Sequence, residues 1–376
     1  MLQVLLYVLY AVLIGIFFLA VWRLRFALTH FKMKSLVTTA QMIEHMPSVT
    51  VCIPARNEHH AMNDALQQVI ASTYPKLEII VLDDMSGDNT SALIKAFAHE
   101  GVRFVEGAKL PAGWLGKNHA LQGLLKEASG TYILFMDVDT RLTPDSIEQL
   151  VSYAQQESAK MVSVLPRRED GMRASVLFSP LRYFWEIMFH QKSSPATASN
   201  AWLIDRQTLL KRFQGFESFK DVIQPEARIS AELMASGEYR FLIGTQMLGV
   251  SYEKKWRSQL STSIRLLSPL LQLRASNSIV AALDLLIVAS PLFILLIGFI
   301  GGWNYNHLIA GILYLMFAGL YGIYLKKVWN KGWIFGGLIW SLIVLQEAAL
   351  VIVSAAQYLQ NNVTWKGRHV KAPKNI

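Results

Sequence analysis

Four long apolar stretches constrain this chain more than any other feature of its sequence. Each approaches the roughly 20 apolar residues that a helix needs to cross a bilayer. They are residues 2–22, 279–303, 307–325 and 333–358. The composition agrees: only 17% of the residues are charged, whereas soluble domains carry about 25%. The sequence therefore predicts one N-terminal and about three C-terminal transmembrane helices.

The positive charges predict how these helices are oriented in a cell membrane. The first stretch lacks a basic leader and a small-residue cleavage site, so we interpret it as a retained anchor and not as a signal peptide. Because its basic residues follow it, the positive-inside bias places the globular region in the cytoplasm. The same bias conflicts with the basic tail, and Gln346 and Glu347 interrupt the last stretch. That stretch is left open between a crossing helix and a re-entrant hairpin.

The remaining sequence predicts an α/β domain between two membrane regions. We expect an anchor over 1–25, a globular domain over 47–256 and a C-terminal membrane region with a basic tail over 257–376. Within the domain, β-rich runs alternate with helical patterns. This order predicts a mainly parallel sheet flanked by helices, which binds ligands beyond the carboxyl ends of its strands.

The charge balance is explained by the membrane without a nucleic-acid partner. The net charge is +9 and the pI is near 9.5. Both a nucleic acid and an anionic membrane surface would attract such a chain. Much of the positive charge lies next to apolar stretches, so we expect membrane lipids and no nucleic acid as partners. The single cysteine, Cys52, excludes a disulfide framework and a multi-cysteine zinc site.

Polar clusters follow three of the predicted strands. They are Pro54–Glu58, Asp83–Thr90 and Asp137–Asp139. A carboxylate pair two residues apart at a strand end offers oxygen ligands to Mg²⁺ or Mn²⁺, which neutralise a diphosphate. Taken singly, each cluster is better explained by a turn or a helix cap. Their joint position at successive strand ends favours a nucleotide site.

Together the three clusters resemble the family 2 glycosyltransferases of the GT-A fold, over roughly residues 48–240. The resemblance implies a Rossmann-like sheet, a nucleotide-sugar donor and a divalent cation, Mn or Mg. Asp139 would hold the cation with the diphosphate, and Asp137 the ribose. The other nucleotide contacts that the resemblance implies are Pro54, Ala55, Arg56, Glu58, and Asp83 or Asp84.

Two further segments resemble a narrower group of membrane glycosyltransferases. Leu110–Ala120 and Thr364–Arg368 are similar to segments of the diaponeurosporenoate glycosyltransferases of carotenoid biosynthesis and of their hopanoid-associated relatives. This implies a UDP-sugar donor, expected to be UDP-glucose, and a lipid or carotenoid acceptor. Lys117, at the start of a helix, would lie near the donor phosphates. The alternative is a solvated helix-terminal lysine.

The catalytic base departs from the family pattern. Inverting members carry Glu-Asp before a helix, and counting back from Gly237 places Glu226 at the aspartate's position. Asp221 is the alternative base, and a charge that only stabilises the helix N-terminus is the structural alternative. The Gln-x-x-Arg-Trp element of processive synthases is missing, which disfavours polymer extrusion. From the similar residues present here, only Trp256 is expected at the active site.

The segment 176–189 combines aromatic residues with Arg182. It is either an interfacial helix that admits a lipid acceptor or a core helix packed on the sheet. We expect an inverting glycosyltransferase acting on a lipid acceptor at the membrane. Transfer to a polyprenyl phosphate, polysaccharide synthesis and a non-catalytic membrane scaffold are the alternatives. The oligomeric state stays open.

Overall fold

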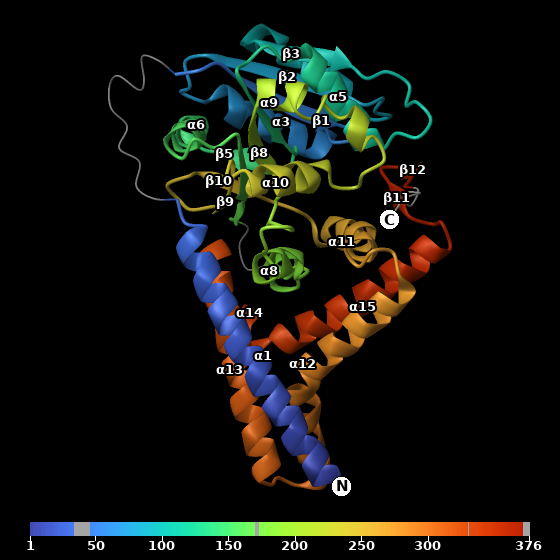
Figure 1. The fold of residues 1–376 in the computed structure, drawn as a ribbon. Coiled ribbons are helices and arrows are strands. Elements are labelled where there is room, and N and C mark those ends of the chain that lie inside the picture. Colours follow the sequence, from blue (N-terminus) through green and yellow to red (C-terminus); the bar gives the residue numbers. More distant parts are fainter. Residues whose placement is uncertain (34–45, 170–172, 330, 371–376) are drawn as a thin grey trace. The chain divides into compact units, whose positions relative to one another are not determined.

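The computed structural model describes residues 1–33, 46–169, 173–329 and 331–370 (Figure 1). By their internal packing they form two compact units. We call Phe31–Glu169 with His190–Glu253 the α/β unit. We call Met1–His30, Asp170–Phe189 and Lys254–Ile376 the helical unit.

The α/β unit is built on a seven-stranded sheet of order β3-β2-β1-β4-β8-β6-β9 (Figure 1). β1 is parallel to β2 and β4, and β2 is parallel to β3, whereas β8 is antiparallel to its neighbours. This arrangement confirms the predicted α/β fold with a mainly parallel sheet. In sheet order the strands are Val102–Glu106, Leu77–Asp83, Val49–Ala55, Tyr132–Met136, Ala201–Asp205, Met161–Leu165 and Tyr239–Ile243.

Helices cover this sheet through apolar faces. α3 (His59–Ile70) buries Ala61, Met62, Ala65, Leu66 and Val69, which recur at helical spacing along one side. β1 is buried along almost its whole length, as expected for a strand between two helical layers. The other helices of this unit are α4 (Thr90–Ala96), η1 (Ala98–Glu100), α5 (Gly116–Glu127), α6 (Ser146–Gln156), α9 (Arg206–Lys211), η2 (Glu217–Phe219) and α10 (Pro225–Ala235).

A small second sheet follows directly after β4. It consists of β5 (Thr140–Leu142), β10 (Val250–Tyr252) and β7 (Arg167–Arg168). β10 pairs antiparallel with β5 and parallel with β7. The loop between β4 and β5 is therefore held at both of its ends by sheet hydrogen bonds.

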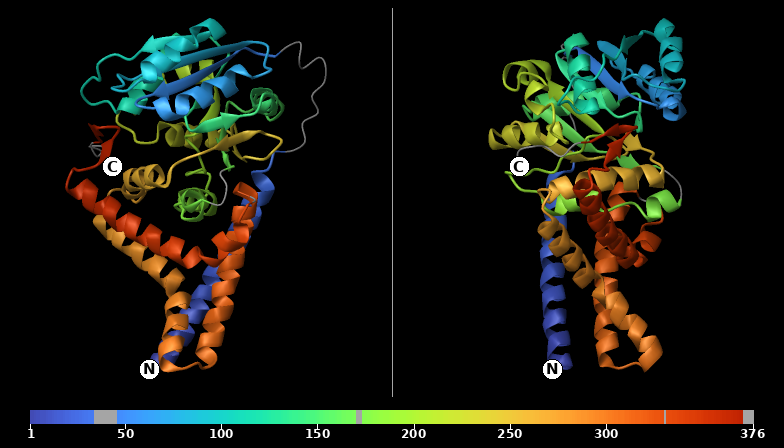
Figure 2. Two further views of the ribbon diagram at one scale, coloured as in Figure 1. Left: turned by 180° about the vertical axis from the view of Figure 1, so that it is seen from behind. Right: turned by 90° about the vertical axis from the view of Figure 1, so that its right-hand side faces the viewer.

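Among its described residues, the helical unit contains four helices that are long and apolar enough to cross a membrane. They are α1, α12, α13 and α15, which confirms one N-terminal and three C-terminal candidates. α1 packs against α13, and the two helices can be followed in Figures 1 and 2. The elements of this unit are α1 (Leu2–His30), α7 (Ala174–Leu177), α8 (Arg182–Met188), α11 (Trp256–Leu270), α12 (Ala275–Gly301), α13 (Tyr305–Val328), α14 (Trp333–Leu338), α15 (Trp340–Leu359), β11 (Thr364–Trp365) and β12 (Arg368–His369).

The last apolar stretch forms two helices, α14 and the longer α15. Its polar residues do not interrupt α15, because both bind the backbone of another segment. Gln346 donates from Nε2 to the carbonyl of Phe178 over 3.1 Å, and Glu347 Oε2 accepts from the amide of Leu181 over 3.1 Å. The segment that carries α7 and α8 therefore packs within the helical unit, and α8 is not a core helix on the sheet.

Candidate functional site

The loops after β1 and β2 are tied together by hydrogen bonds. The guanidinium of Arg56 donates to the carbonyl oxygens of Asp84 and Met85. The amide of Asn57 donates to the Ser86 hydroxyl over 2.9 Å. Two polar clusters that lie about 30 residues apart in sequence thus form one surface at the carboxyl end of the parallel strands.

Within this surface the two neighbouring aspartates have different roles. Asp83 is buried, and its two carboxylate oxygens accept hydrogen bonds from the hydroxyls of Ser86 and Ser91. Asp84 is also buried, and its backbone amide donates to the carbonyl of Ala55 over 2.8 Å. The Asp83 carboxylate therefore stabilises the loop that follows β2. The hydrogen bond between Asp84 and Ala55 joins the ends of β1 and β2.

Asp88 fixes the start of α3 to the loop after β2. One carboxylate oxygen lies 2.7 Å from Nδ1 of His59, and the other accepts from the amide of Thr90 over 3.0 Å. Burial alone would raise the pKa of Asp88, but hydrogen bonds from Thr90 and His59 hold it well below its usual range. Asp88 is therefore an ionised structural carboxylate at neutral pH.

The carboxylate pair lies in the loop between β4 and β5, as predicted. The amide of Asp137 and the hydroxyl of Thr140 both donate to the carbonyl of Asn200, over 2.9 and 2.8 Å. The carbonyl of Asp139 accepts from the amide of Glu253 over 3.2 Å. Backbone contacts on both sides therefore fix the positions from which the two carboxylates project.

Lys117 reaches this carboxylate pair from the first turn of α5. Its Nζ lies 2.7 Å from Oδ1 of Asp137, and each side chain is about a quarter exposed. An ammonium group at a helix N-terminus suits an anionic ligand, because the unpaired amides of the first turn add positive charge. Lys117 is therefore paired with a carboxylate of the predicted site, and its contact with the donor phosphates stays a prediction.

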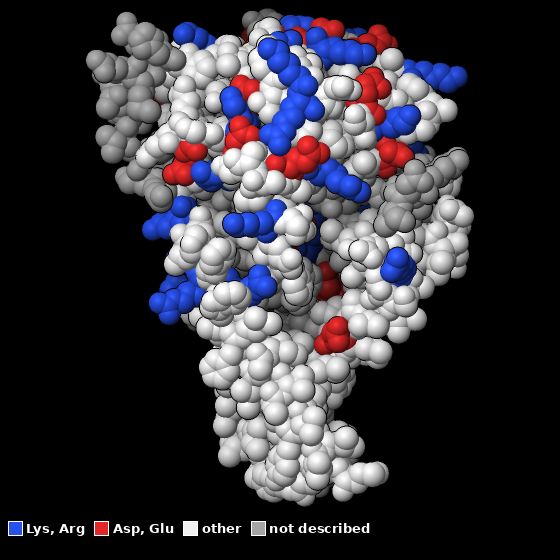
Figure 3. Space-filling model, in the orientation of Figure 1, with Lys and Arg blue, Asp and Glu red and all other residues white. Residues whose placement is uncertain are grey.

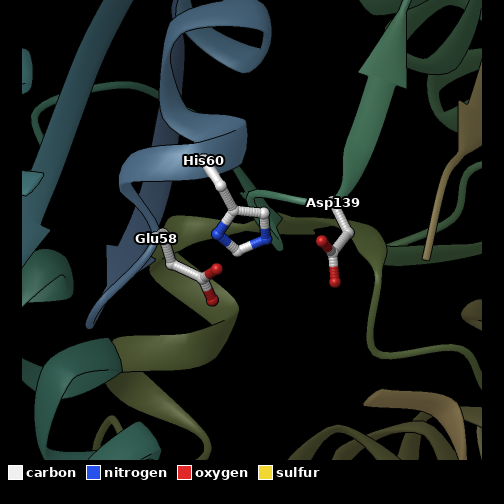
Figure 4. Close-up of side chains that lie close together, drawn as sticks. All are labelled: Glu58, His60 and Asp139. Carbon is white, nitrogen blue, oxygen red and sulfur yellow. The ribbon is translucent and has the colours of Figure 1, made fainter. Parts of the chain in front are cut away.

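Glu58, His60 and Asp139 bring possible metal ligands together (Figure 4). Their ligand atoms all lie within 4.8 Å of one another. Glu58 precedes α3 and His60 lies in its first turn, whereas Asp139 follows β4. Our sequence analysis missed His60. The two consecutive histidines after Glu58 were the available signal, and only the fold shows which of them faces Asp139.

The candidate base Glu226 lies in the first turn of α10, directly after Pro225, and is only 3% exposed. The loop before α10 is held by Asn118, whose buried amide group donates to the carbonyls of Phe219 and Val222 over 2.6 and 2.7 Å. The alternative base, Asp221, is exposed in this loop. Burial distinguishes Glu226 from Asp221, because a buried carboxylate is the better candidate for a tuned base.

Trp256 belongs to the helical unit, where it begins α11. Its indole nitrogen donates to the carbonyl of Phe178 over 3.2 Å. The role of Trp256 at the active site stays a prediction.

Pro54 lies in β1, where it is paired with Leu82 of β2. It comes one residue before the surface that the two loops form.

Comparison with known proteins shows what much of the α/β unit is similar to. Residues 50–212 match the family model described as glycosyl transferase family 2. A mannosyltransferase from Pyrobaculum calidifontis, solved with GDP-Man and Mn²⁺, has a similar fold, with a TM-score of 0.59 at 19% identity. The likeness covers 96% of this chain and 99% of that one. It confirms the GT-A fold.

Two curated relatives are similar over part of the chain. A 4,4'-diaponeurosporenoate glycosyltransferase from Staphylococcus aureus (strain bovine RF122 / ET3-1) is 33% identical over 121 residues, 32% of each protein. An undecaprenyl-phosphate 4-deoxy-4-formamido-L-arabinose transferase from Yersinia enterocolitica is 29% identical over 133 residues, 34% of this chain and 40% of the relative. The matched region thus spans only 32% and 40% of the length of these two relatives.

Proposed function

We propose that this glycosyltransferase, whose residues 50–212 match family 2, transfers a sugar from a UDP-sugar to a lipid acceptor with inversion. The donor sugar is expected to be glucose and the acceptor a carotenoid or other isoprenoid, reached at the cytoplasmic membrane face. The observation that carries the proposal is the Lys117–Asp137 pair beside Asp139 at the carboxyl end of β4. The four apolar helices on the same chain provide access to a water-insoluble substrate.

The chemical step is a single displacement. Glu226 takes the proton from the acceptor hydroxyl as its oxygen attacks the anomeric carbon of the sugar. The bond from that carbon to the diphosphate oxygen breaks, and UDP leaves with the electron pair. Lys117 stabilises the negative charge that develops on the departing diphosphate. If the acceptor is already a carboxylate, no proton has to be removed, which would explain why the base differs from the family pattern.

The residues present suit a divalent cation, Mn²⁺ or Mg²⁺, and Asp139 would hold it. Bound there, the ion would neutralise the diphosphate of the donor. Asp137, paired with Lys117, is then positioned for the ribose. The acidic and imidazole donors within 4.8 Å of one another provide the fit, because both types bind such ions.

The second candidate function is sugar transfer to a polyprenyl phosphate. The similarity to the undecaprenyl-phosphate transferase favours it. A phosphate acceptor, like a carboxylate, is already ionised and needs no base. The catalytic residues therefore cannot distinguish the two acceptors, and only the reaction products can.

The test is a transfer assay with the full-length protein in nanodiscs. Radiolabelled UDP-glucose, UDP-GlcNAc and GDP-mannose are supplied with a carotenoid acid, a carotenoid alcohol or undecaprenyl phosphate, with and without Mn²⁺. We expect lipid-soluble product from UDP-glucose and a carotenoid substrate. A product formed only on undecaprenyl phosphate would establish the second candidate, and a labelled polymer would refute both.

The same assay tests the base. Glu226→Gln should reduce transfer to the hydroxyl acceptor by about 100-fold or more, since general bases contribute about 10²–10⁴-fold. It should leave transfer to the carboxylate acceptor unchanged. The matched control is Asp221→Asn, which removes the exposed carboxylate of the preceding loop. Equal losses on both acceptors, or a loss with Asp221→Asn alone, would contradict the assignment.

A further inference from the structure

Three side chains from two separate elements converge beside the carboxyl end of β4. Figure 4 shows the imidazole of His60 between the carboxylates of Glu58 and Asp139. Their ligand atoms lie within 4.8 Å of one another. Two ligands on opposite sides of an ion at about 2.1 Å would be about 4.2 Å apart. Three donors on one ion cannot all lie opposite one another, and adjacent ligands are only about 3.0 Å apart, so these side chains have to move closer together to share one cation.

The backbone on each side of this cluster is already fixed. The amide of Glu58 donates to the Thr90 hydroxyl over 2.9 Å, which holds the start of α3. The carbonyl of Asp139 accepts from the amide of Glu253. The ligand positions therefore need no nucleotide to assemble them. Glu58 and Asp139 are half-buried and His60 is exposed, so an ion can enter from solvent.

The chemistry of the donors limits which ion fits. Magnesium prefers oxygen ligands and keeps several waters, whereas imidazole nitrogen suits manganese and the later transition metals. A set of one nitrogen and two carboxylate donors thus favours Mn²⁺ over Mg²⁺. In the usual order of stability, Co²⁺ binds such a set more tightly than Mn²⁺.

We propose that Glu58, His60 and Asp139 form a resident site for one transition-metal dication, which binds before the donor nucleotide arrives. The inference rests on the proposed function, to which it adds the identity of the ion and two further ligands. Glu58 then binds the ion in place of the nucleoside contact that the family resemblance implied. His60 and Glu58 supply positive charge to the donor site indirectly, through the ion that they hold.

The experiment titrates the full-length protein in nanodiscs with Mn²⁺ alone, without nucleotide, and follows free Mn²⁺ by electron paramagnetic resonance. We expect one bound ion per chain, displaced by Co²⁺ and only weakly by Mg²⁺. Pulsed measurements on the bound ion should show coupling to a ¹⁴N nucleus. His60→Ala should abolish that coupling and weaken Mn²⁺ binding by at least about tenfold, as for metal sites that lose a key interaction.

His59→Ala is the matched control. It removes the neighbouring imidazole, which pairs with Asp88 over 2.7 Å and lies outside the cluster. The control should keep both the affinity and the ¹⁴N coupling. Because the nitrogen signal of the wild-type protein tests the site directly, the inference does not depend on the stability of any variant.

Three outcomes would overturn the inference: no bound Mn²⁺ without nucleotide, bound Mn²⁺ without ¹⁴N coupling, or unchanged affinity and coupling in His60→Ala. The second of these would show that His60 is not a ligand of the ion. If UDP-glucose is still transferred in a metal-dependent way, the proposed function survives that failure. If Mn²⁺ binds with the nitrogen signal but no sugar is transferred, the site stands and the proposed function fails.

Discussion

The ammonium of Lys117 and the carboxylate of Asp137 form the ion pair that most directly links the structure to donor binding. Their 2.7 Å separation occurs where both side chains are about a quarter exposed. Partly solvated pairs contribute only about 0–1 kcal/mol to folding, so stability is a weak reason for this contact. We propose that the pair serves donor binding, because it places a cation at the N-terminus of α5, where the lysine and the helix dipole would both attract a diphosphate.

Replacing Lys117 by Gln should weaken UDP binding by about 10- to 100-fold, because a charge-assisted hydrogen bond contributes about 1.5–3 kcal/mol. Calorimetric titration with UDP measures the change. Lys126→Gln, in the last turn of the same helix, is the control and should bind UDP normally. Equal affinities in the two variants would show that Lys117 is a solvated helix-terminal lysine.

At the scale of elements, α5 connects the donor side of the site to the candidate base. Its residue Asn118 is buried and donates to the carbonyls of Phe219 and Val222 in the loop before α10. The amide of Leu115 donates to the carbonyl of Lys220 over 2.7 Å. The same helix start thus carries Lys117 and fixes the approach to Glu226.

Asn118→Ala would leave two carbonyls without their donor in a buried place, which costs about 1–3 kcal/mol. We expect a lower midpoint of thermal unfolding and a kcat that falls more than the KM for the donor rises, because the α10 loop shifts. Lys126→Ala supplies the control for a surface change on α5. A folded Asn118→Ala protein with unchanged kcat would show that the position of this loop does not affect catalysis.

The parallel half of the sheet and its polar edge could be predicted because both depend on local pattern. β1, β2 and β4 are mainly apolar runs, and polar residues follow the end of each run within a few positions. The contacts that were missed join distant parts of the chain. His60 meets Asp139 only through the packing of α3 against β5, and Glu347 binds Leu181 across 166 positions. Hydropathy therefore identified Glu347 as an interruption, whereas the structure shows a buried acceptor.

At the scale of the whole molecule, the helical unit places the N-terminus beside the loop between α12 and α13. The hydroxyls of Tyr7 and Tyr305 lie 3.0 Å apart, and Tyr10 donates to the carbonyl of Asn306 over 3.0 Å. On the face shown in Figure 3, the described residues at this end are uncharged. The positive-inside bias predicts the outer side of the membrane for both segments.

This topology predicts a labelling pattern that the sequence makes easy to measure. The single native cysteine, Cys52, is buried and should contribute little background. Trp303→Cys, in the loop after α12, should react with a membrane-impermeant maleimide in intact cells. His99→Cys, on the exposed surface of the α/β unit, should react only after permeabilisation. The reverse pattern would place the active site outside the cytoplasm.

The most direct measurement of the central claim is sugar transfer by the wild-type protein and by Asp139→Asn, in nanodiscs with radiolabelled UDP-glucose, Mn²⁺ and a carotenoid acid. We expect a lipid-soluble product carrying a single sugar from the wild-type protein. The variant should lose at least about 100-fold of this activity, because the charge of the departing diphosphate is no longer compensated. Undiminished transfer by Asp139→Asn, or no lipid-linked sugar from the wild-type protein, would contradict the central claim.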